Sequence, residues 1–146
     1  MFYGEFEQAV DAQGRVLLPA PYRARLGKTL VVTRGLDGCL LVYTLSQWEQ
    51  VASSVGQLPL TRSVARAFTR LLLGSASDQA LDGQGRLTLP LALRQWAGVE
   101  TAAVVVGAGD HLEIWSAQAW ADQTTQLAHD NAAIAESLSQ LGFALG

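Results

Sequence analysis

The sequence predicts an α+β fold with a mainly β core, built from two similar halves and flanked by helices. One observation is a nine-residue stretch that occurs twice, as DAQGRVLLP at Asp11–Pro19 and as DGQGRLTLP at Asp82–Pro90. A second is that Arg23 matches Arg94 at the same offset of 71 residues, so the duplication extends beyond the nine letters. Four short strands around one short helix cannot enclose a core, whereas two such units packed about a pseudo-twofold axis can.

Each half is predicted to run through a strand, a tight turn, a strand, a short helix, a strand, a turn and a last strand. Gly14 and Gly85 suit the tight turns because glycine supplies the positive φ that such turns need. Gly27 and Gly98 stand where the short helices should end. The strands predicted after the tight turns are residues 15–18, 30–33 and 40–43 in the first half and 86–89, 103–106 and 112–115 in the second.

Helical sequence follows the first half. Ser46-Gln47-Trp48-Glu49 predicts a capping box, with Ser46 as the N-cap of a helix that Gly56 and Pro59 end. A second helix is predicted from about Arg62 to Leu73. Its arginines share one face, which is interpreted either as a solvated surface or as a contact surface for a polyanion. They are Arg62, Arg66 and Arg70, and the apolar residues predicted on the opposite face are Val64, Phe68, Leu71 and Leu72.

A long helix is predicted after the second half. Ser116 is its expected N-cap, and an alanine-rich sequence continues to about Leu141. Apolar residues recur every seven positions along it, a spacing that favours one continuous stripe. They are Trp120, Leu127, Ile134 and Leu141. The stripe could pack either on the core or on a neighbouring protomer.

The charge distribution is more informative than the net charge of −3. Residues 1–94 contain all ten basic residues and seven acidic ones, a balance of +3. The remaining residues contain six acidic residues and no basic ones. Such asymmetry is typical of a polyanion-facing region beside an acidic tail, and equally of an ordinary surface followed by an acidic helix.

Composition also bounds the cellular location. Cys39 is the single cysteine, which allows no internal disulfide and favours a reducing compartment. The N-terminal residues lack the basic and apolar regions of a signal peptide. No apolar run approaches the roughly 20 residues of a membrane-spanning helix. A cytoplasmic protein without a membrane partner is expected.

Several longer stretches identify a family. They are Met1-Phe2-x-Gly4-Glu5, DAQGRVLLP, VVTRGLDGCLLVY (Val31–Tyr43), GSASDQALDGQGRLTLP (Gly74–Pro90) and VVVGAGDHLEIWS (Val104–Ser116). In these the chain resembles the MraZ proteins, bacterial transcription regulators built from two SpoVT-AbrB units. The resemblance covers the chain to about Trp120. One Asp-x-x-Gly-Arg element is a modest motif, but two copies with their downstream strands are highly specific.

The resemblance implies a swapped-hairpin AbrB-like β-barrel in which the two halves interlock. It divides the chain into a first repeat (5–47), a helical connector (48–75), a second repeat (76–119) and a C-terminal helix (120–146). It also implies a ring-shaped homo-oligomer that binds repeated short boxes of double-stranded DNA. The usual target of the family is the promoter of the division and cell-wall gene cluster, which it usually represses, so a nucleoid-associated protein is expected.

The duplicated loops offer suitable chemistry for DNA recognition. The planar guanidinium groups of Arg15 and Arg86 can bridge O6 and N7 of guanine, or grip a phosphate. The amides of Gln13 and Gln84 suit adenine or phosphate. The remaining predicted contacts are Arg23 and Arg94 on the short helices, as candidates for phosphate binding.

The spacing shared by the two loops also has a purely structural interpretation. Asp11 and Asp82 each precede an arginine by four residues, so each pair could form an ion pair that stabilises the turn. Gly14 and Gly85 would then shape the turn. On the residues alone the structural and DNA-binding interpretations are equally good. The family resemblance favours DNA contact by the arginines, with the aspartates in support.

The sequence also bears on two other classes of function. An enzyme is not predicted, because the sequence contains no nucleophile–base pairing, zinc motif, Walker loop or G-x-G-x-x-G. No catalytic residue, metal, cofactor or small-molecule substrate is therefore expected. The alternative is an antitoxin-like or protein-interaction module with no direct DNA role, which would bind its partner through the acidic C-terminal helix.

Overall fold

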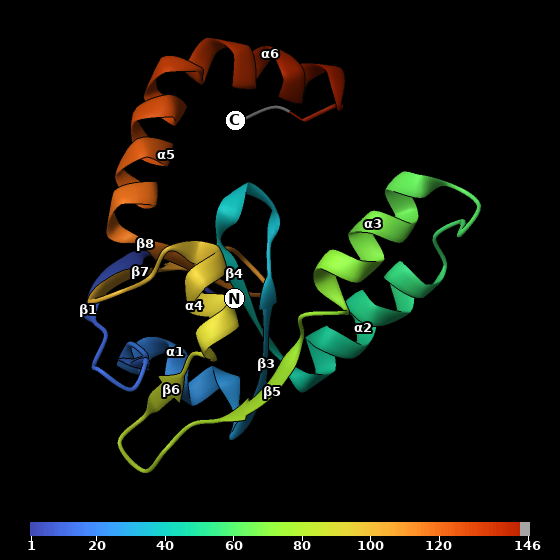
Figure 1. Ribbon diagram of the computed structural model, residues 1–146. Coiled ribbons are helices and arrows are strands. Elements are labelled where there is room, and N and C mark those ends of the chain that lie inside the picture. Colours follow the sequence, from blue (N-terminus) through green and yellow to red (C-terminus); the bar gives the residue numbers. More distant parts are fainter. Residues whose placement is uncertain (144–146) are drawn as a thin grey trace.

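The computed structural model describes residues 1–143 (Figure 1), so residues 144–146 of the predicted C-terminal helix lie outside the described residues. The strands are β1 (Glu5–Ala9), β2 (Arg15–Leu17), β3 (Thr29–Arg34), β4 (Leu40–Thr44), β5 (Ser77–Ala80), β6 (Arg86–Thr88), β7 (Ala102–Gly107) and β8 (Leu112–Ser116). The helices are α1 (Ala20–Leu26), α2 (Leu45–Gly56), α3 (Ser63–Leu72), α4 (Leu91–Ala97), α5 (Ala117–His129) and α6 (Asn131–Gln140), and η1 (Leu36–Gly38) is a short 3₁₀ turn. The predicted α+β class with a β core is confirmed.

The two halves exchange their first strands. Six antiparallel strands form one sheet in the order β1-β7-β8-β4-β3-β5. β1 belongs to the first half and pairs with β7 of the second, whereas β5 of the second half pairs with β3 of the first. β4 and β8 join the halves in the middle of the sheet. Neither half could therefore complete its sheet without the other.

The barrel expected from the resemblance is not closed by hydrogen bonds among residues 1–143. β1 and β5 are the two edges of the six-stranded sheet. β2 and β6 pair with each other and form a separate two-stranded ribbon. Each contributes only three residues, and within residues 1–143 only an isolated bridge between Val10 and Val16 links the chain after β1 to the ribbon.

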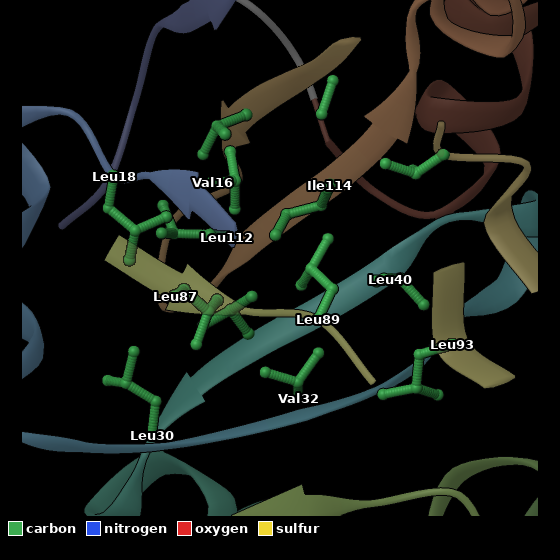
Figure 2. Close-up of a cluster of buried hydrophobic side chains, with 14 of the residues drawn as sticks. Val16, Leu18, Leu30, Val32, Leu40, Leu87, Leu89, Leu93, Leu112 and Ile114 are labelled. Carbon is green, nitrogen blue, oxygen red and sulfur yellow. The ribbon is translucent and has the colours of Figure 1, made fainter. Parts of the chain in front are cut away.

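The core lies between the ribbon and the sheet (Figure 2). Val16 and Leu87 project into it from the ribbon, and Leu18 and Leu89 enter directly after it; all four side chains are fully buried. They meet leucine and valine side chains of the sheet, including Leu30, Val32, Leu40 and Leu112. Burying one such side chain contributes about 1.5–3 kcal/mol. Equivalent residues from both halves thus build one shared core.

The helix after the first half begins slightly earlier than predicted. Thr44, not Ser46, is the N-cap of α2, because β4 runs to Thr44 and the chain turns into the helix immediately after it. The Thr44 hydroxyl accepts a hydrogen bond from the backbone N–H of Gln47. In α3 the predicted apolar face is partly wrong. Ala65 and Leu72 are buried, but Val64 is exposed.

The C-terminal helix is divided, which corrects the prediction of one continuous helix. Ser116 caps α5 as predicted by accepting from the N–H of Ala119. α5 ends at His129, and α6 begins after Asp130. Asp and Asn side chains compete with the backbone for hydrogen bonds, so the Asp130–Asn131 step favours a helix end. None of the helices in residues 1–143 is long and apolar enough to cross a membrane.

Among the described residues, the apolar stripe of α5 and α6 contacts the sheet at Trp120 and is exposed farther along. Figure 1 shows α5 rising from the sheet and α6 turning across the top of the view. Trp120 is half-buried, packed on Trp115 with ring centroids 5.5 Å apart. Farther along, Leu127 and Ile134 remain 44% and 37% exposed, and Leu141 is exposed too.

Candidate nucleic-acid interface

The β2–β6 ribbon presents four side chains outward. Its register pairs Arg15 with Thr88, Val16 with Leu87, and Leu17 with Arg86. Side chains alternate along a strand, so the inward-facing Val16–Leu87 pair leaves the other two pairs on the opposite face. Arg15 and Arg86 are therefore diagonal neighbours on one surface, a relation that typically spaces residues about 7–8 Å apart.

The two loops that lead into the ribbon have the same hydrogen bonds. In the first, the Asp11 carboxylate accepts from the backbone N–H groups of Gln13 (3.0 Å) and Arg15 (2.9 Å), and from Arg15 Nε (2.6 Å). In the second, Asp82 accepts from the N–H groups of Gln84 (2.9 Å) and Arg86 (2.8 Å), and from Arg86 Nε (2.7 Å). Each carboxylate thus closes its own turn.

The ion pairs considered from the sequence are therefore present in both loops. The backbone N–H of Arg15 is the main cause that lowers the pKa of Asp11, and the N–H of Arg86 does the same for the pKa of Asp82. Solvent screens an ion pair this exposed, so the pair contributes little to stability. The main consequence of the contact is geometric, because it fixes the direction of each guanidinium group.

The structural and DNA-binding interpretations of the loops are compatible. Each aspartate engages the Nε edge of its arginine, and within residues 1–143 the terminal Nη groups of Arg15 and Arg86 have no protein acceptor. The arginine side chains remain 32% and 30% exposed. Each guanidinium group is thus oriented on one edge and available on the other.

Each loop is also supported by the other half of the chain. The N–H of Leu18 donates to the carbonyl of Gly85 (3.1 Å), and the N–H of Leu89 donates to the carbonyl of Gly14 (2.9 Å). Both glycines have φ of +81°, as predicted for the tight turns. A Cβ atom at Gly14 would overlap the guanidinium of Arg94, and one at Gly85 would overlap the side chain of Arg23.

Arg23 and Arg94 thus have a role that the sequence did not reveal. Arg23 Nη1 donates to the backbone carbonyl of Gln84 (3.3 Å), and Arg94 Nε donates to that of Leu89 (3.0 Å). Each arginine lies against the loop of the opposite half. Together with Arg15, Arg86 and the two aspartates, they give the loops and the ribbon a balance of +2. Gln13 and Gln84 are exposed at the tips of the loops.

The arginine face of α3 lies elsewhere. Figure 1 shows α2 and α3 as a helical pair on the right, whereas β6 is at the lower left. Arg62, Arg66 and Arg70 are all exposed, and Arg66 Nη1 donates to the carbonyl of Leu60 (2.9 Å). This face forms a second basic surface, separate from the ribbon.

A cavity of about 500 Å³ lies between α2, α3 and strands β4 and β8. His111 borders it. The His111 side chain is only 20% exposed and packs on Tyr43 with ring centroids 5.2 Å apart. Glu113, foremost, and Asp110 raise the pKa of His111, and burial opposes them. Residues 1–143 contain no group of three or more His, Cys, Asp and Glu placed to hold a metal ion.

Sequence reasoning missed two outward-facing residues of the ribbon, Leu17 and Thr88. Leu17 is 41% exposed although it lies in the middle of an apolar stretch of sequence. The alternation of side chains along a strand could have revealed it, because Leu17 lies two residues after Arg15 and must share its face.

Comparisons with a family model and with known proteins all match MraZ. A family model described as "MraZ protein, putative antitoxin-like" matches residues 1–71 and again residues 72–141. The chain is 44% identical over 138 residues to the transcriptional regulator MraZ of Lactiplantibacillus plantarum, covering 94% of this chain and 98% of the relative. It is 42% identical over 142 residues to the transcriptional regulator MraZ of Desulfitobacterium hafniense, covering 97% and 99%. The protein of the same name from Herpetosiphon aurantiacus is 44% identical with the same coverage.

Proposed function

Because the chain belongs to the MraZ family, we propose that it is a transcriptional regulator that binds promoter DNA in a sequence-specific manner through the β2–β6 ribbon and its two loops. Relatives that are similar over nearly their whole length are named transcriptional regulators, and none of those compared is named an enzyme. The question that remains is which surface meets the DNA.

The observation that carries the proposal is the diagonal pair of arginines on the ribbon. The major groove of B-DNA is about 12 Å wide and admits a two-stranded β-ribbon. Arg15 and Arg86 lie on the outward face of such a ribbon, each held on its Nε edge by an aspartate. The remaining Nη groups suit O6 and N7 of guanine, and each good contact of this kind contributes about 1–3 kcal/mol of discrimination.

The neighbouring polar residues support this arrangement. Gln13 and Gln84 are exposed at the loop tips, and in the proposed complex their amides bind bases or phosphates at the edge of the groove. Arg23 and Arg94 hold the opposite loops and add the positive potential that attracts a phosphate backbone. Asp11, Asp82, Gly14 and Gly85 shape the loops. The interlocked halves suit the swapped-hairpin AbrB-like barrel with the repeat boundaries given above.

Self-association is part of the proposal. One ribbon has only two arginines, so a single box would be bound weakly. Several ribbons on a ring-shaped homo-oligomer that met repeated boxes on one DNA would make the later contacts intramolecular. The exposed stripe of α5 and α6, with Leu127 and Ile134, is the surface that favours such an assembly. The proposed target is the promoter of the division and cell-wall gene cluster, and the proposed effect is repression at the nucleoid.

The test is a fluorescence-anisotropy titration with DNA from upstream of the protein's own gene cluster. Arg15→Ala/Arg86→Ala removes both guanidinium groups and hence two base contacts, so it should weaken DNA binding by at least about thirtyfold. The matched control is Arg62→Ala/Arg70→Ala, which removes the same charge from α3. It should reduce affinity much less, and wild-type binding should weaken steeply with salt.

Mass measurements would first establish that every variant keeps the wild-type assembly. If the α3 variant lost affinity and the ribbon variant did not, the DNA site would lie on α3. If wild-type protein bound no DNA, the antitoxin-like or protein-interaction alternative would be favoured. Its partner would then be sought on the acidic α5–α6 region, where Ile134→Asp should abolish partner binding.

A further inference from the structure

The outward face of the β2–β6 ribbon breaks the symmetry of the repeat at one position. The pseudo-twofold axis passes between Val16 and Leu87, the central pair of the register. This axis relates Arg15 to Arg86, so the two arginines are equivalent. It also relates Leu17 to Thr88, which differ in chemistry. Elsewhere in the nine-residue loops the only other exposed difference is Ala12 against Gly83, a single methyl group.

Leu17 lies outside the buried hydrophobic core. It is 41% exposed and its two neighbours in sequence, Val16 and Leu18, are fully buried. In the register it lies directly opposite Arg86, whereas Thr88 lies directly opposite Arg15. A DNA group bound by Arg86 would therefore have a leucine as its neighbour, and a DNA group bound by Arg15 would have a threonine.

The two side chains differ in what they can recognise in a groove. Leucine offers only apolar atoms, and in the major groove the apolar group is the 5-methyl of thymine. Threonine offers a methyl group and a hydroxyl that can donate to or accept from either type of base pair. A ribbon with identical residues at the two positions would present the same side chains to DNA in both orientations. This ribbon presents different side chains in the two orientations.

We infer that Leu17 and Thr88 are specificity residues that give the ribbon a direction on DNA, with Leu17 facing a thymine methyl group. The inference rests on the proposed function and goes beyond it. The preferred box is then not a palindrome, although the fold that reads it is nearly twofold symmetric. One half of the box carries thymine at the position beside the guanine that Arg86 contacts.

The experiment is selection of bound duplexes from a random DNA library, followed by sequencing. Four proteins are compared with wild type: Leu17→Thr, Thr88→Leu, the exchange Leu17→Thr/Thr88→Leu, and Leu36→Thr as control. Leu36 is an exposed leucine on η1, outside the ribbon. Wild type and the control should enrich one non-palindromic box. Each ribbon single variant has a symmetric outward face and should enrich a more palindromic box.

The exchange variant gives the sharpest readout. Its ribbon is the wild-type ribbon turned by 180°, so it should enrich the wild-type box again, although both single variants do not. A role of Leu17 in stability alone would not produce this recovery. In the selected box, replacing the critical thymine by deoxyuridine should weaken wild-type binding about fourfold, the equilibrium effect of one buried methyl group. The same replacement should weaken DNA binding by Leu17→Ser less than about twofold.

The outcomes separate the inference from the function on which it rests. If wild type enriches no sequence, the proposed DNA-reading function fails. If wild type enriches a box and both single variants enrich the same box, DNA reading stands and the inference about Leu17 and Thr88 is overturned. Circular dichroism and mass measurements establish folding, and Thr88→Leu, which leaves Leu17 in place, carries the test if Leu17→Thr is unstable.

Discussion

In the first half of the chain the Asp11 carboxylate lies 2.6 Å from Arg15 Nε, and in the second half Asp82 lies 2.7 Å from Arg86 Nε. The helices that follow the two halves, by contrast, differ in their contacts with the sheet. After the first half, α3 is fastened to β3, because Arg34 donates to the carbonyls of Arg70 and Leu71 and Thr33 donates to that of Leu72. After the second half, α5 and α6 leave the sheet with their apolar stripe exposed.

The difference follows from what each region contacts. Each loop is completed by the opposite half, through Arg94 behind Gly14 and Arg23 behind Gly85. A change in either loop therefore disturbs both halves, and two similar sequences form two similar structures. The flanking helices contact mainly their own half and can differ without disturbing the twofold core. The similar region is the one for which we propose DNA binding, and the dissimilar region is the one for which we propose assembly.

The largest effect is expected in the shared core. Leu18→Ala and Leu89→Ala remove equivalent, fully buried side chains, so each should lower the free energy of unfolding by about 2–5 kcal/mol. Because both residues enter one core, the two losses should agree to within about 1 kcal/mol, whereas Leu60→Ala, at an exposed leucine between α2 and α3, should change the value by less than about 0.5 kcal/mol. Urea unfolding at one fixed protein concentration measures all three.

The same measurement shows whether the halves unfold together. A single transition is expected for each variant, because each half needs a strand of the other to complete its sheet. Two separate transitions, or a large loss for only one of the leucines, would show that the halves are independent. The comparison between a shared core and separate flanking helices would then be wrong.

The loops and strands could be predicted because their signals lie within a few residues. The positive φ of Gly14 and Gly85 follows from the tight turn, and the Ser116 cap follows from the residues beside it. For α2 the same reasoning chose Ser46 although Thr44 is the cap, since both are hydroxyl residues and only the end of β4 decides between them. Local patterns of this kind place an element to within a turn of helix.

The contacts between the halves could not be predicted from such patterns. Arg94 lies behind Gly14, 80 positions away in the sequence, and this contact depends on the exchange of β1 and β5. The sequence therefore predicts only phosphate contact for Arg23 and Arg94 and does not reveal their packing on the loops. The face shared by Arg15 and Leu17 needed no long-range information, only the alternation along β2.

A smaller effect is expected at the glycines of the loops. Gly14→Ala and Gly85→Ala should each lower the free energy of unfolding by about 1–2 kcal/mol, because φ of +81° is unfavourable for a residue with a Cβ atom. The new methyl group must also displace Arg94 or Arg23. Gly83→Ala is the matched control, since no atom lies within 4 Å of a Cβ there. Equal losses for the two loops would support the twofold comparison, and a loss confined to one would contradict it.

The smallest effect concerns a turn at which the halves differ, where Cys39 in the first half corresponds to His111 in the second. Burial, the largest cause, raises the pKa of Cys39 to about 12, so the first turn does not titrate near neutral pH. Glu113 and Asp110 raise the pKa of His111 above its usual 6.5. The protonated form is favoured in the folded state, so its stabilisation is present below about pH 6.5 and is lost as pH rises through the folded pKa.

The melting temperature of wild type, compared with that of His111→Gln at the same pH, should therefore fall as the pH rises from 6.5 through the pKa of folded His111. The difference should correspond to less than about 1 kcal/mol, because Asp110 is 57% exposed and its ion pair is screened. Cys39→Ser is the control for the equivalent turn and should leave the pH dependence unchanged even if it lowers the melting temperature. If His111→Gln kept the wild-type pH dependence, another group would be responsible, and the two turns would not differ in the way that their contacts indicate.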